Sequence, residues 1–320
     1  MSIRVSLIHN ALFPIQKYGG TERVIWWLAK GLHELGHSVQ LVCNPQSSCP
    51  FAEIISYADF AQGKSSLKSE IQHFFYSPPA EPKTPYVVTI EGNGQVGERF
   101  LPNTIFVSED HARRHGAIAF VYNGLDPDDY IFNPEQATRS GLLFLAKASW
   151  SVKNVRGAIR IARLSNKHLN ILGGSRWWLP QWRGVSWRGM LGGSEKSQWI
   201  AGAEALVFPV LWHEPFGIAV TEALVSGTPV LATPFGSLKE LVPAQVGKLC
   251  STYEDFIQQA ANLSQFKPQD CRDWALSKFH YLKMTQSYLS LYERVLNGHQ
   301  LNPNPPVTPP SAQKVPFDFL

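Results

Sequence analysis

The sequence predicts an α/β protein made of two doubly wound, Rossmann-like domains, each built around a parallel sheet. Short apolar, β-prone runs alternate along the chain with segments whose apolar residues recur at helical spacing. This alternation occurs twice, on either side of residues 133–141, a stretch without apolar periodicity. With 320 residues, of which 44% are hydrophobic and 17% charged, the chain is long enough for two separate cores.

The first half begins with an expected strand at 3–9, which is followed by a loop containing Gly19 and Gly20. A helix is expected next, with Thr21 as its N-cap and Gly36 just past its end, because the apolar residues between them recur at helical spacing. The stretch 45–85 is poorly patterned. Further strands are expected at 38–44, 86–91, 104–109 and 117–124. Strands separated by helices predict a parallel sheet covered on both faces.

The second half repeats this organisation. Strands are expected at 142–148, 169–174, 185–189, 205–210 and 229–234. Helices are expected at 154–166, 217–227, 253–265 and 283–297. The predicted divisions are an N-terminal domain over 1–138, a second domain over 139–282, a C-terminal helix over 283–298, and a Pro-rich tail over 299–320. The composition of that tail predicts an extended or disordered segment.

Composition excludes several classes of function. The net charge of +4 and the absence of any run of Lys or Arg argue against nucleic-acid binding, although mild basicity favours anionic ligands. The four cysteines show no C-x-x-C spacing, which argues against zinc or a disulfide framework and favours reduced thiols in the cytoplasm. No stretch resembles a signal sequence or reaches the roughly 20 apolar residues of a membrane span, so only peripheral contact with the inner face of a membrane is expected.

Two glutamates, Glu214 and Glu222, lie in the apolar segment "LWHEPFGIAVTEALVSGTPVLATPFGS". Glu222 is surrounded by apolar residues, and an unpaired buried carboxylate is unfavourable. If the whole interval were helical, the two would lie roughly 12 Å apart, which suits one long polyhydroxylated ligand but not the acid and nucleophile of a retaining glycosidase. The alternative is that Glu214 caps a helix and Glu222 lies on its exposed face.

The residues after Glu214 predict a helix N-terminus at the end of an expected strand. Pro215 suits the first turn of a helix, where its missing N–H would be unpaired. The N–H groups of Phe216, Gly217 and Ile218 would then form a positive end, and Gly217 would let a ligand approach the backbone. A bound anion or a sugar hydroxyl would suit this position.

The segment "FPVLWHEPFGIAVTEALVSGTPVLATPFGSLKELV" resembles the signature of glycosyltransferase family 4, whose members are retaining enzymes with the GT-B fold. Similar segments are "KYGGTERVIWWLAKGLHELGHSVQLV", "IFVSEDHARRHG", "VYNGLDPDDYIF", "LLFLAKASWSVKN" and "CRDWALSKFHYLKMTQSYLSLYERVL", and the match covers most of 3–297. The resemblance implies an acceptor-binding first domain and a donor-binding second domain that face a central cleft. It also implies a last helix that packs back on the first domain.

Roles for the donor-site residues follow from the resemblance. Glu222 is implied to hold the ribose hydroxyls of a nucleotide-sugar, and Glu214 to lie beside the donor sugar, whose hydroxyls the amides of Phe216, Gly217 and Ile218 would bind.

The family's Arg and Lys that bind the diphosphate correspond to Lys147 and Lys153. The chain departs from the pattern here, because Lys147 lacks the two-pronged guanidinium of arginine and the interval is one residue longer. A solvated loop charge is the alternative for both lysines.

In the first domain, Gly19 and Gly20 are expected to let the backbone approach the diphosphate or the acceptor, and a plain turn is the alternative. The family has a His in a "T-x-H-G" pattern that contacts the transferred sugar, whereas "TIEGNG" places Glu91 there. Glu91 would favour a hydroxyl or an amine and repel a uronate, or it has lost the role. His111 is a candidate contact for the acceptor, although a lone His is more often structural.

The stretch 175–189 interleaves Trp and Arg, which fits packing, base stacking or contact with a membrane surface. The family's register places Trp187 and Arg188 near the nucleotide base.

The resemblance as a whole implies retaining transfer of a sugar from a UDP- or GDP-sugar to the hydroxyl of a carbohydrate or glycolipid acceptor, without a metal or a cofactor, in the synthesis of surface glycans. The departing phosphate would take the acceptor's proton. Two alternatives are a non-catalytic GT-B subunit that binds a nucleotide and a GT-B nucleotide-sugar epimerase.

Overall fold

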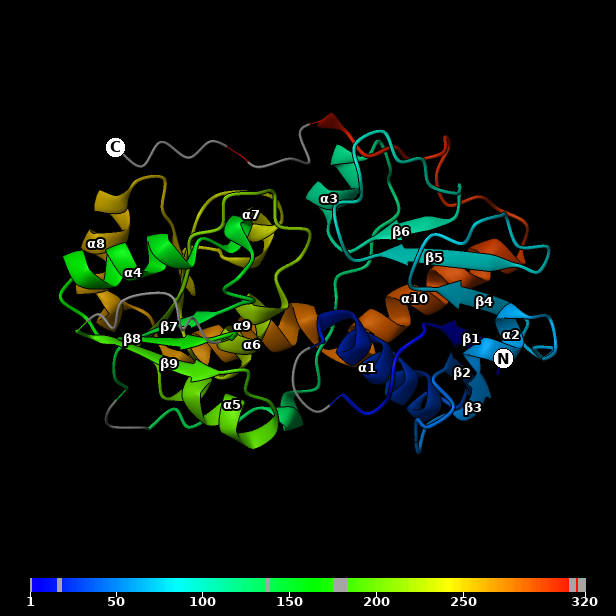
Figure 1. Ribbon diagram of the computed structural model, residues 1–320, viewed down its shortest axis with the longest axis horizontal. Helices are drawn as coiled ribbons and strands as arrows, with labels where there is room; N and C mark the ends of the chain where they lie inside the picture. Colours follow the sequence, from blue (N-terminus) through cyan, green and yellow to red (C-terminus); the bar gives the residue numbers. More distant parts are fainter. Residues whose placement is uncertain (1, 16–18, 136–138, 175–182, 311–314, 316–320) are drawn as a thin grey trace. The chain divides into compact units, whose positions relative to one another are not determined.

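The computed structural model describes residues 2–15, 19–135, 139–174, 183–310 and 315. The described residues of 2–125 and 279–310 form one compact unit, unit 1, and those of 126–278 form a second, unit 2 (Figure 1). The predicted α/β architecture with two sheets is confirmed. The chain leaves unit 1 after Leu125, earlier than the predicted division at 138, because the segment around Tyr130 packs on helices of unit 2.

Unit 1 contains a six-stranded sheet in the order β3-β2-β1-β4-β5-β6, in which all neighbouring strands are parallel. Its strands are β1 (Arg4–Ile8), β2 (Ser38–Cys43), β3 (Glu53–Ser56), β4 (Ile71–Phe74), β5 (Tyr86–Ile90) and β6 (Thr104–Phe106). Its helices are α1 (Gly20–Glu34), α2 (Tyr57–Ala61), α3 (Glu109–Arg114) and α10 (Tyr281–Leu296). The strands are short and mostly buried, as expected where helices cover both faces of a parallel sheet.

The last helix, α10, packs against α1 within unit 1. The contact is close because Gly31 of α1 has no side chain: a Cβ there would lie 2.2 Å from Oγ1 of Thr285. Farther along α10, the hydroxyl of Tyr292 lies 2.7 Å from Nδ1 of His73 on β4, whose Nε2 lies 2.8 Å from Oγ1 of Thr89 on β5. A buried polar network therefore joins the helix to the centre of the sheet.

The tail predicted over 299–320 to be extended or disordered is described over 299–310, where it has no helix or strand and is held against unit 1, which contradicts disorder for these residues. Asn302 is 1% exposed and accepts the N–H groups of Ile118 and Ala119 while its amide donates to the carbonyls of Pro102 and Thr104. Composition alone could not choose between the two alternatives, because a proline-rich segment can satisfy its backbone against a neighbouring surface without forming regular structure.

Unit 2 contains a second parallel six-stranded sheet, in the order β12-β11-β10-β7-β8-β9. Its strands are β7 (Leu142–Leu145), β8 (Leu169–Leu172), β9 (Val185–Gly189), β10 (Ala205–Phe208), β11 (Val230–Ala232) and β12 (Gly247–Leu249). Its α-helices are α4 (Val155–Leu164), α5 (Gly193–Ala201), α6 (Ile218–Val225), α7 (Leu238–Leu241), α8 (Tyr253–Ala261) and α9 (Pro268–Phe279). Short 3-10 helices lie at η1 (Pro127–Asp129), η2 (Ser151–Lys153) and η3 (Leu263–Gln265). Helices α4 and α8 pack together, as do α5 and α6, and the two pairs lie on opposite faces of the sheet (Figure 1).

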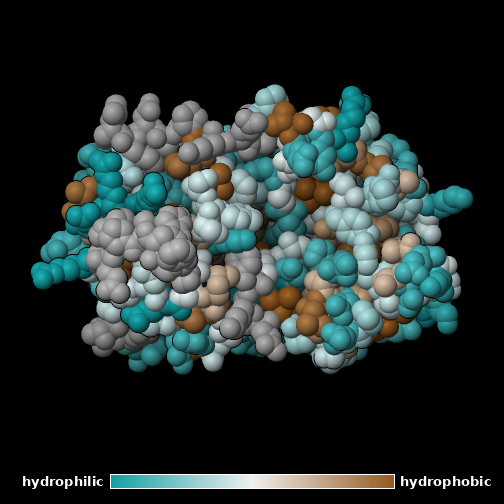
Figure 2. Space-filling model, in the orientation of Figure 1, coloured by the Kyte–Doolittle hydropathy of each residue, from teal (hydrophilic) through white to brown (hydrophobic). Residues whose placement is uncertain are grey.

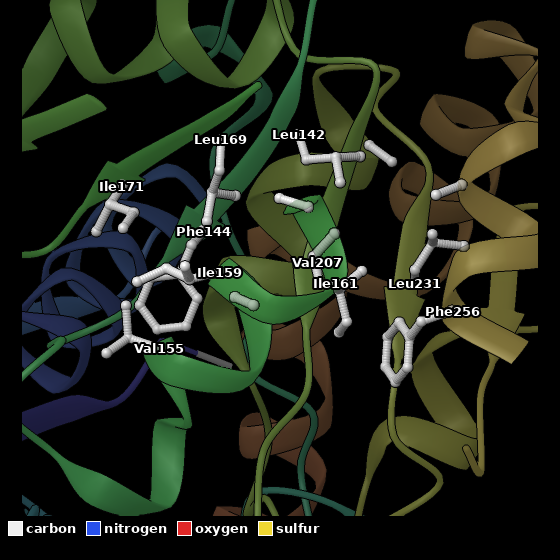
Figure 3. Packing of buried hydrophobic residues seen from close by; sticks show 14 of the residues in the cluster. Leu142, Phe144, Val155, Ile159, Ile161, Leu169, Ile171, Val207, Leu231 and Phe256 are labelled. Atoms are coloured by element: carbon white, nitrogen blue, oxygen red, sulfur yellow. The ribbon is translucent and has the colours of Figure 1, made fainter. Parts of the chain in front are cut away.

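The core of unit 2 lies between its sheet and the pair α4 and α8. Figure 3 shows side chains of β7, β8, β10 and β11 meeting those of α4 and α8, among them Phe144, Ile159 and Phe256. Burial of each such side chain contributes about 1.5–3 kcal/mol, so this layer stabilises the packing of α4 and α8 on the sheet.

Two local predictions were wrong. Residues 117–124 do not form a strand and make only an isolated bridge between Phe106 and Phe120. Helix α1 begins at Gly20 with Gly19 as its N-cap, so Thr21 lies inside the helix. The poorly patterned stretch 45–85 contains β3, α2 and β4, whose short lengths leave too few residues for a periodic signal.

On the face drawn in Figure 2, hydrophilic residues predominate and apolar residues are scattered in small groups. None of the helices in the described part of the chain has the length and hydrophobicity that crossing a bilayer requires.

Candidate functional site

A buried ion pair lies at the carboxyl edge of the unit 2 sheet. Nζ of Lys153 lies 2.8 Å from Oε1 and 2.7 Å from Oε2 of Glu214, and the two residues are 8% and 5% exposed. Nζ also lies 4.7 Å from the ring centroid of Trp212 and 5.3 Å from that of Phe208. The attraction between this ammonium group and the carboxylate is stronger than it would be in water, because the pair is buried among aromatic rings.

Asn154 fixes Lys153 in place. Its backbone has the left-handed conformation (φ 56°, ψ 50°), and its Oδ1 accepts the N–H of Gly157 at 3.0 Å, which caps α4. Its Nδ2 donates to the carbonyl of Pro209, just beyond β10, at 2.9 Å. One side chain therefore links the start of α4 to the end of the strand that leads to Glu214.

The loop before α6 is held from the other side by the residues that follow β11. Ser237 donates its N–H to the carbonyl of Glu214 at 3.0 Å and its hydroxyl to the carbonyl of Phe216 at 2.6 Å. Gly236 has φ +65°, and a Cβ there would lie 2.3 Å from the backbone oxygen of Glu214. The close approach of the two loops thus requires glycine at position 236.

Helix α6 begins at Ile218, with Gly217 as its N-cap in the left-handed region (φ 93°, ψ 61°). Pro215 therefore precedes the helix and does not lie in its first turn, which corrects that prediction and removes the premise of a continuous helix from Glu214 to Glu222. Of the three N–H groups predicted to form a positive helix end, only that of Ile218 lies in α6, because Gly217 is the N-cap and Phe216 precedes it.

Glu222 lies in the middle of α6 and is 4% exposed. It forms an ion pair with Lys196 of α5 and accepts the hydroxyl of Tyr130 at 2.7 Å, both at Oε1. The alternative of an exposed Glu222 is therefore wrong.

Two tryptophans extend the cluster around Lys153. Nε1 of Trp212 donates to Oε2 of Glu214 at 2.6 Å, and its ring lies 6.4 Å from that of Trp150 in an edge-on arrangement. Nζ of Lys147 lies 5.3 Å from the centroid of Trp150. The structure thus gives Lys147 an aromatic neighbour and Lys153 a carboxylate. Sequence reasoning missed Trp212, although it stands two residues before Glu214.

In unit 1, Glu91 follows β5 directly. Its Oε2 accepts Nδ2 of Asn123 at 2.7 Å, whereas Oε1 of Glu91 and Oδ1 of Asn123 are buried without a hydrogen-bond partner among the described residues. Burial raises the pKa of the Glu91 carboxyl to about 7, against the lowering effect of Asn123, and the charge of Glu22 adds to the rise. Two buried acceptor atoms at one strand end would accept hydrogen bonds from a ligand.

Gly19 and Gly20 lie at the start of α1, next to the titratable side chains of Glu22 and His9. Gly19 is the N-cap of α1 and Gly20 its first residue, and a Cβ on Gly19 would lie 2.7 Å from Oε2 of Glu22. Oε1 of Glu22 lies 3.9 Å from Nε2 of His9, and hydrogen bonding to His9 is the main cause that lowers the pKa of Glu22.

His111 lies in the first turn of α3 and is fully buried. Its ring meets Phe106 and His115 edge-on, and burial lowers its pKa well below the usual value. This packing favours the structural alternative, and a contact with an acceptor remains only a prediction.

Residues 175–182 of the Trp- and Arg-rich stretch lie outside the described residues. Trp187 of β9 packs against the core of unit 2, and Arg188 donates from Nε to Oδ1 of Asn170 at 3.1 Å and lies over the ring of Trp199. Of the predicted alternatives, the structure shows packing for Trp187. Contact of Trp187 or Arg188 with a nucleotide base stays a prediction.

Residues 139–265 match the sequence model of a family described as Glycosyl transferases group 1. A protein named as an uncharacterized 41.2 kDa protein in the cps region of Klebsiella pneumoniae is 26% identical over 145 residues. That match covers 42% of this chain and 40% of the relative, so the chain aligns with only two fifths of its curated relative's length.

Several solved structures share the fold. AviGT4, a glycosyltransferase involved in avilamycin A biosynthesis, has a TM-score of 0.79 at 22% identity, over 94% of this chain and 100% of its own. Sucrose-phosphate synthase from Thermosynechococcus elongatus has a TM-score of 0.72 at 14% identity, over 92% and 100% of the two chains. HepE of Anabaena, in complex with UDP and glucose, has a TM-score of 0.65 at 13% identity, over 91% and 99%. The chain thus has the two-domain α/β fold of GT-B glycosyltransferases.

Proposed function

We propose that this protein is a glycosyltransferase that moves a sugar from a nucleoside-diphosphate sugar, a UDP- or GDP-sugar, to an acceptor hydroxyl. The observation that carries the proposal is the pair of buried glutamates on either side of the start of α6, Glu214 held by Lys153 and Glu222 held by Lys196. The match of 139–265 to a glycosyltransferase family covers this region and supports the proposal, as does the complex of HepE with UDP and glucose.

In the proposed site, unit 2 binds the donor. Glu222 accepts hydrogen bonds from the ribose hydroxyls, because an ionised carboxylate is an acceptor at both oxygens. Glu214 lies beside the sugar, and the backbone N–H groups of Phe216, Gly217 and Ile218 bind its hydroxyls and the adjoining phosphate.

Unit 1 provides the acceptor side in this proposal. The loop of Gly19 and Gly20 approaches the diphosphate or the acceptor, and Glu91 accepts a hydrogen bond from a neutral sugar hydroxyl or amine. The relative in the cps region supports an acceptor among surface carbohydrates or glycolipids. The net charge of +4 supports a cytoplasmic protein that contacts the anionic inner face of a membrane at its surface.

The proposed reaction breaks the bond between the anomeric carbon and the diphosphate oxygen and forms a bond from that carbon to the acceptor oxygen on the same face. The acceptor's proton passes to the departing phosphate oxygen, so that charge is balanced and the configuration is retained. Negative charge grows on the leaving group, where Lys147, Lys153 and the α6 amides stabilise it without a metal. Such preorganised electrostatics usually make the largest contribution to catalysis.

Thermal unfolding with UDP, GDP, ADP, TDP and their sugars tests the proposal on the wild type and on Glu222→Ala. A nucleotide at a hundred times its dissociation constant should stabilise the wild type by about 2.7 kcal/mol and raise its midpoint. The variant should lose that increase. A midpoint that no nucleotide raises would contradict a donor site in this chain.

Transfer is tested separately with the nucleotide-sugar that binds. Release of the nucleoside diphosphate in the presence of a glycan or glycolipid acceptor is expected for the wild type and not for Glu214→Ala. Binding without any release would favour the non-catalytic alternative, and normal turnover in Glu214→Ala would contradict the assignment of Glu214.

A further inference from the structure

Glu222 needs a partner in order to remain charged. It lies in α6 among Val220, Thr221, Ala223 and Leu224, all of them buried, and only 5% of its side chain is exposed. Burial alone favours the neutral form of a carboxyl. A neutral carboxyl has one acceptor position fewer and one donor more, so it is a poorer partner for two neighbouring hydroxyl groups.

Two donors from outside α6 meet Oε1 of Glu222. Lys196 of α5 forms the ion pair, with 7% of its side chain exposed, and Tyr130 donates its hydroxyl at 2.7 Å. Nζ of Lys196 lies 5.7 Å from the centroid of the Tyr130 ring. These two bonds use two of about four lone-pair positions on an ionised carboxylate.

Contacts between neighbouring residues hold Lys196 and Tyr130 next to each other. Ser197, which follows Lys196 in α5, accepts the N–H of Ile131 at its hydroxyl at 2.6 Å, and Ile131 follows Tyr130. Helix α5 packs on α6, so its first turn fixes both donors against Glu222.

Other charged groups near α6 meet different parts of the helix. The packed strands β10 and β11 carry no titratable side chain. Arg139 and Arg272 donate to the carbonyls of Ser226 and Val225 at the C-terminal end of the helix. Lys196 and Tyr130 are thus two titratable groups of the described residues that bond directly to the carboxylate of Glu222.

We propose that Lys196 is a positioning residue for nucleotide binding, which holds Glu222 ionised and in a fixed orientation so that it can accept the ligand's hydroxyl groups. Tyr130 shares in the orientation. This inference rests on the proposed function of Glu222. Lys196 acts through the glutamate and has no direct contact with the ligand in this scheme.

The test measures the dissociation constant of UDP and of GDP by calorimetry between pH 6 and pH 9. The proteins are the wild type, Lys196→Met, Lys196→Arg and Glu222→Gln. Each variant is compared with the wild type at the same pH, so that the effect of the nucleotide's own protonation on the dissociation constant cancels. Lys196→Met is expected to bind at least tenfold more weakly at pH 6.5 and to approach the wild type at pH 9, where Glu222 ionises without the ammonium group of Lys196. Lys196→Arg should stay close to the wild type, and Glu222→Gln should be weak at every pH.

The outcomes separate this inference from the proposed function. If the wild type binds neither nucleotide, the proposed function fails. If the wild type binds but Lys196→Met binds equally well, or is weakened by the same factor at every pH, the role of Lys196 is wrong while the function stands. Should Lys196→Met not fold, Lys196→Gln, which also removes the positive charge, is measured in the same way. A decrease in nucleotide affinity that becomes smaller as the pH rises supports the inference. An unchanged affinity, or a decrease that is the same at every pH, contradicts it.

Discussion

The ammonium nitrogen of Lys153 lies 2.8 and 2.7 Å from the two carboxylate oxygens of Glu214, so that one cation faces both. The side chains are 11% and 6% exposed. At such burial the two charges depend on each other, since either one left alone would be strongly disfavoured.

Lys153→Ala is therefore expected to lower the free energy of unfolding by about 3–5 kcal/mol, because it leaves Glu214 buried and unpaired. The double variant Lys153→Met with Glu214→Leu should be less destabilised than the sum of the single changes, as apolar replacement of both partners is often neutral. Urea unfolding of the wild type, Lys153→Met, Glu214→Leu and the double variant measures this coupling, and Lys153→Ala is unfolded in the same way. Additive effects would show that the pair does not act as a unit.

Trp212→Phe is expected to reduce turnover through Glu214. The change keeps a ring beside Lys153 but removes the indole N–H that lies 2.6 Å from Oε2 of Glu214. A hydrogen bond to a charged group contributes about 1.5–3 kcal/mol, which corresponds to a decrease in kcat of roughly 10- to 150-fold if it is fully used in the transition state.

Trp150→Phe is the matched control for Trp212→Phe, because Trp150 is 43% exposed and its ring lies 6.4 Å from that of Trp212. Its kcat should stay within a few fold of the wild type. Equal losses in both variants would point to general packing rather than to the bond to Glu214.

Glu91→Gln is expected to stabilise the protein at pH 8. The pKa of Glu91 is raised to about 7 from 4.5, so the folded state binds the proton more tightly than the unfolded state. The stability that this preference provides is complete below pH 4.5 and is lost as the pH rises through 7. Unfolding midpoints of the wild type and the variant should therefore diverge between pH 5 and pH 8, with the variant higher at pH 8. Parallel curves would contradict the shift.

The contribution of His73 to stability depends on pH in the opposite direction. Burial lowers its pKa from 6.5 to about 3, so the unfolded state binds the proton more tightly and stability falls as the pH drops below 6.5. The slope for one such group is about 1.4 kcal/mol per pH unit between pH 6 and pH 4. His73→Gln should remove that slope in urea unfolding. Because Glu91 acts in the other direction over part of this range, the comparison is best made in Glu91→Gln.

Asn302→Ala is expected to destabilise unit 1, since it leaves two backbone N–H groups and two carbonyls without their partner. Each buried group that loses its hydrogen bond costs about 1–3 kcal/mol, and partial hydration of the loosened segment should reduce the total to about 2–4 kcal/mol. Asn304→Ala, at an exposed position two residues on, is the control and should change stability by less than about 0.5 kcal/mol. Similar losses in both would mean that the segment is not anchored by Asn302.

The sequence by itself predicted two α/β domains in which strands alternate with helices, and it marked the segment for which a donor site is proposed. Strands such as β1 and β10 and the helix after Glu214 follow from hydrophobic periodicity, which is a local property of the chain. The apolar residues around Glu222 were enough to predict that a charged Glu222 would need a partner if it were buried. Local pattern failed at 117–124, where an apolar run makes only one isolated bridge to β6, and at Asn302, where a proline-rich segment finds its hydrogen bonds in unit 1.

Only the tertiary structure decided which partner each glutamate has. Lys153 precedes Glu214 by 61 positions and Lys196 precedes Glu222 by 26, and no periodicity relates residues at such separations. The sheet brings Lys153 to Glu214 because the loops after parallel strands meet at one edge. The packing of α5 on α6 brings Lys196 and Tyr130 to Glu222. The sequence shows that burial of a carboxylate would be unfavourable without a partner, whereas the tertiary structure determines which cation lies beside it.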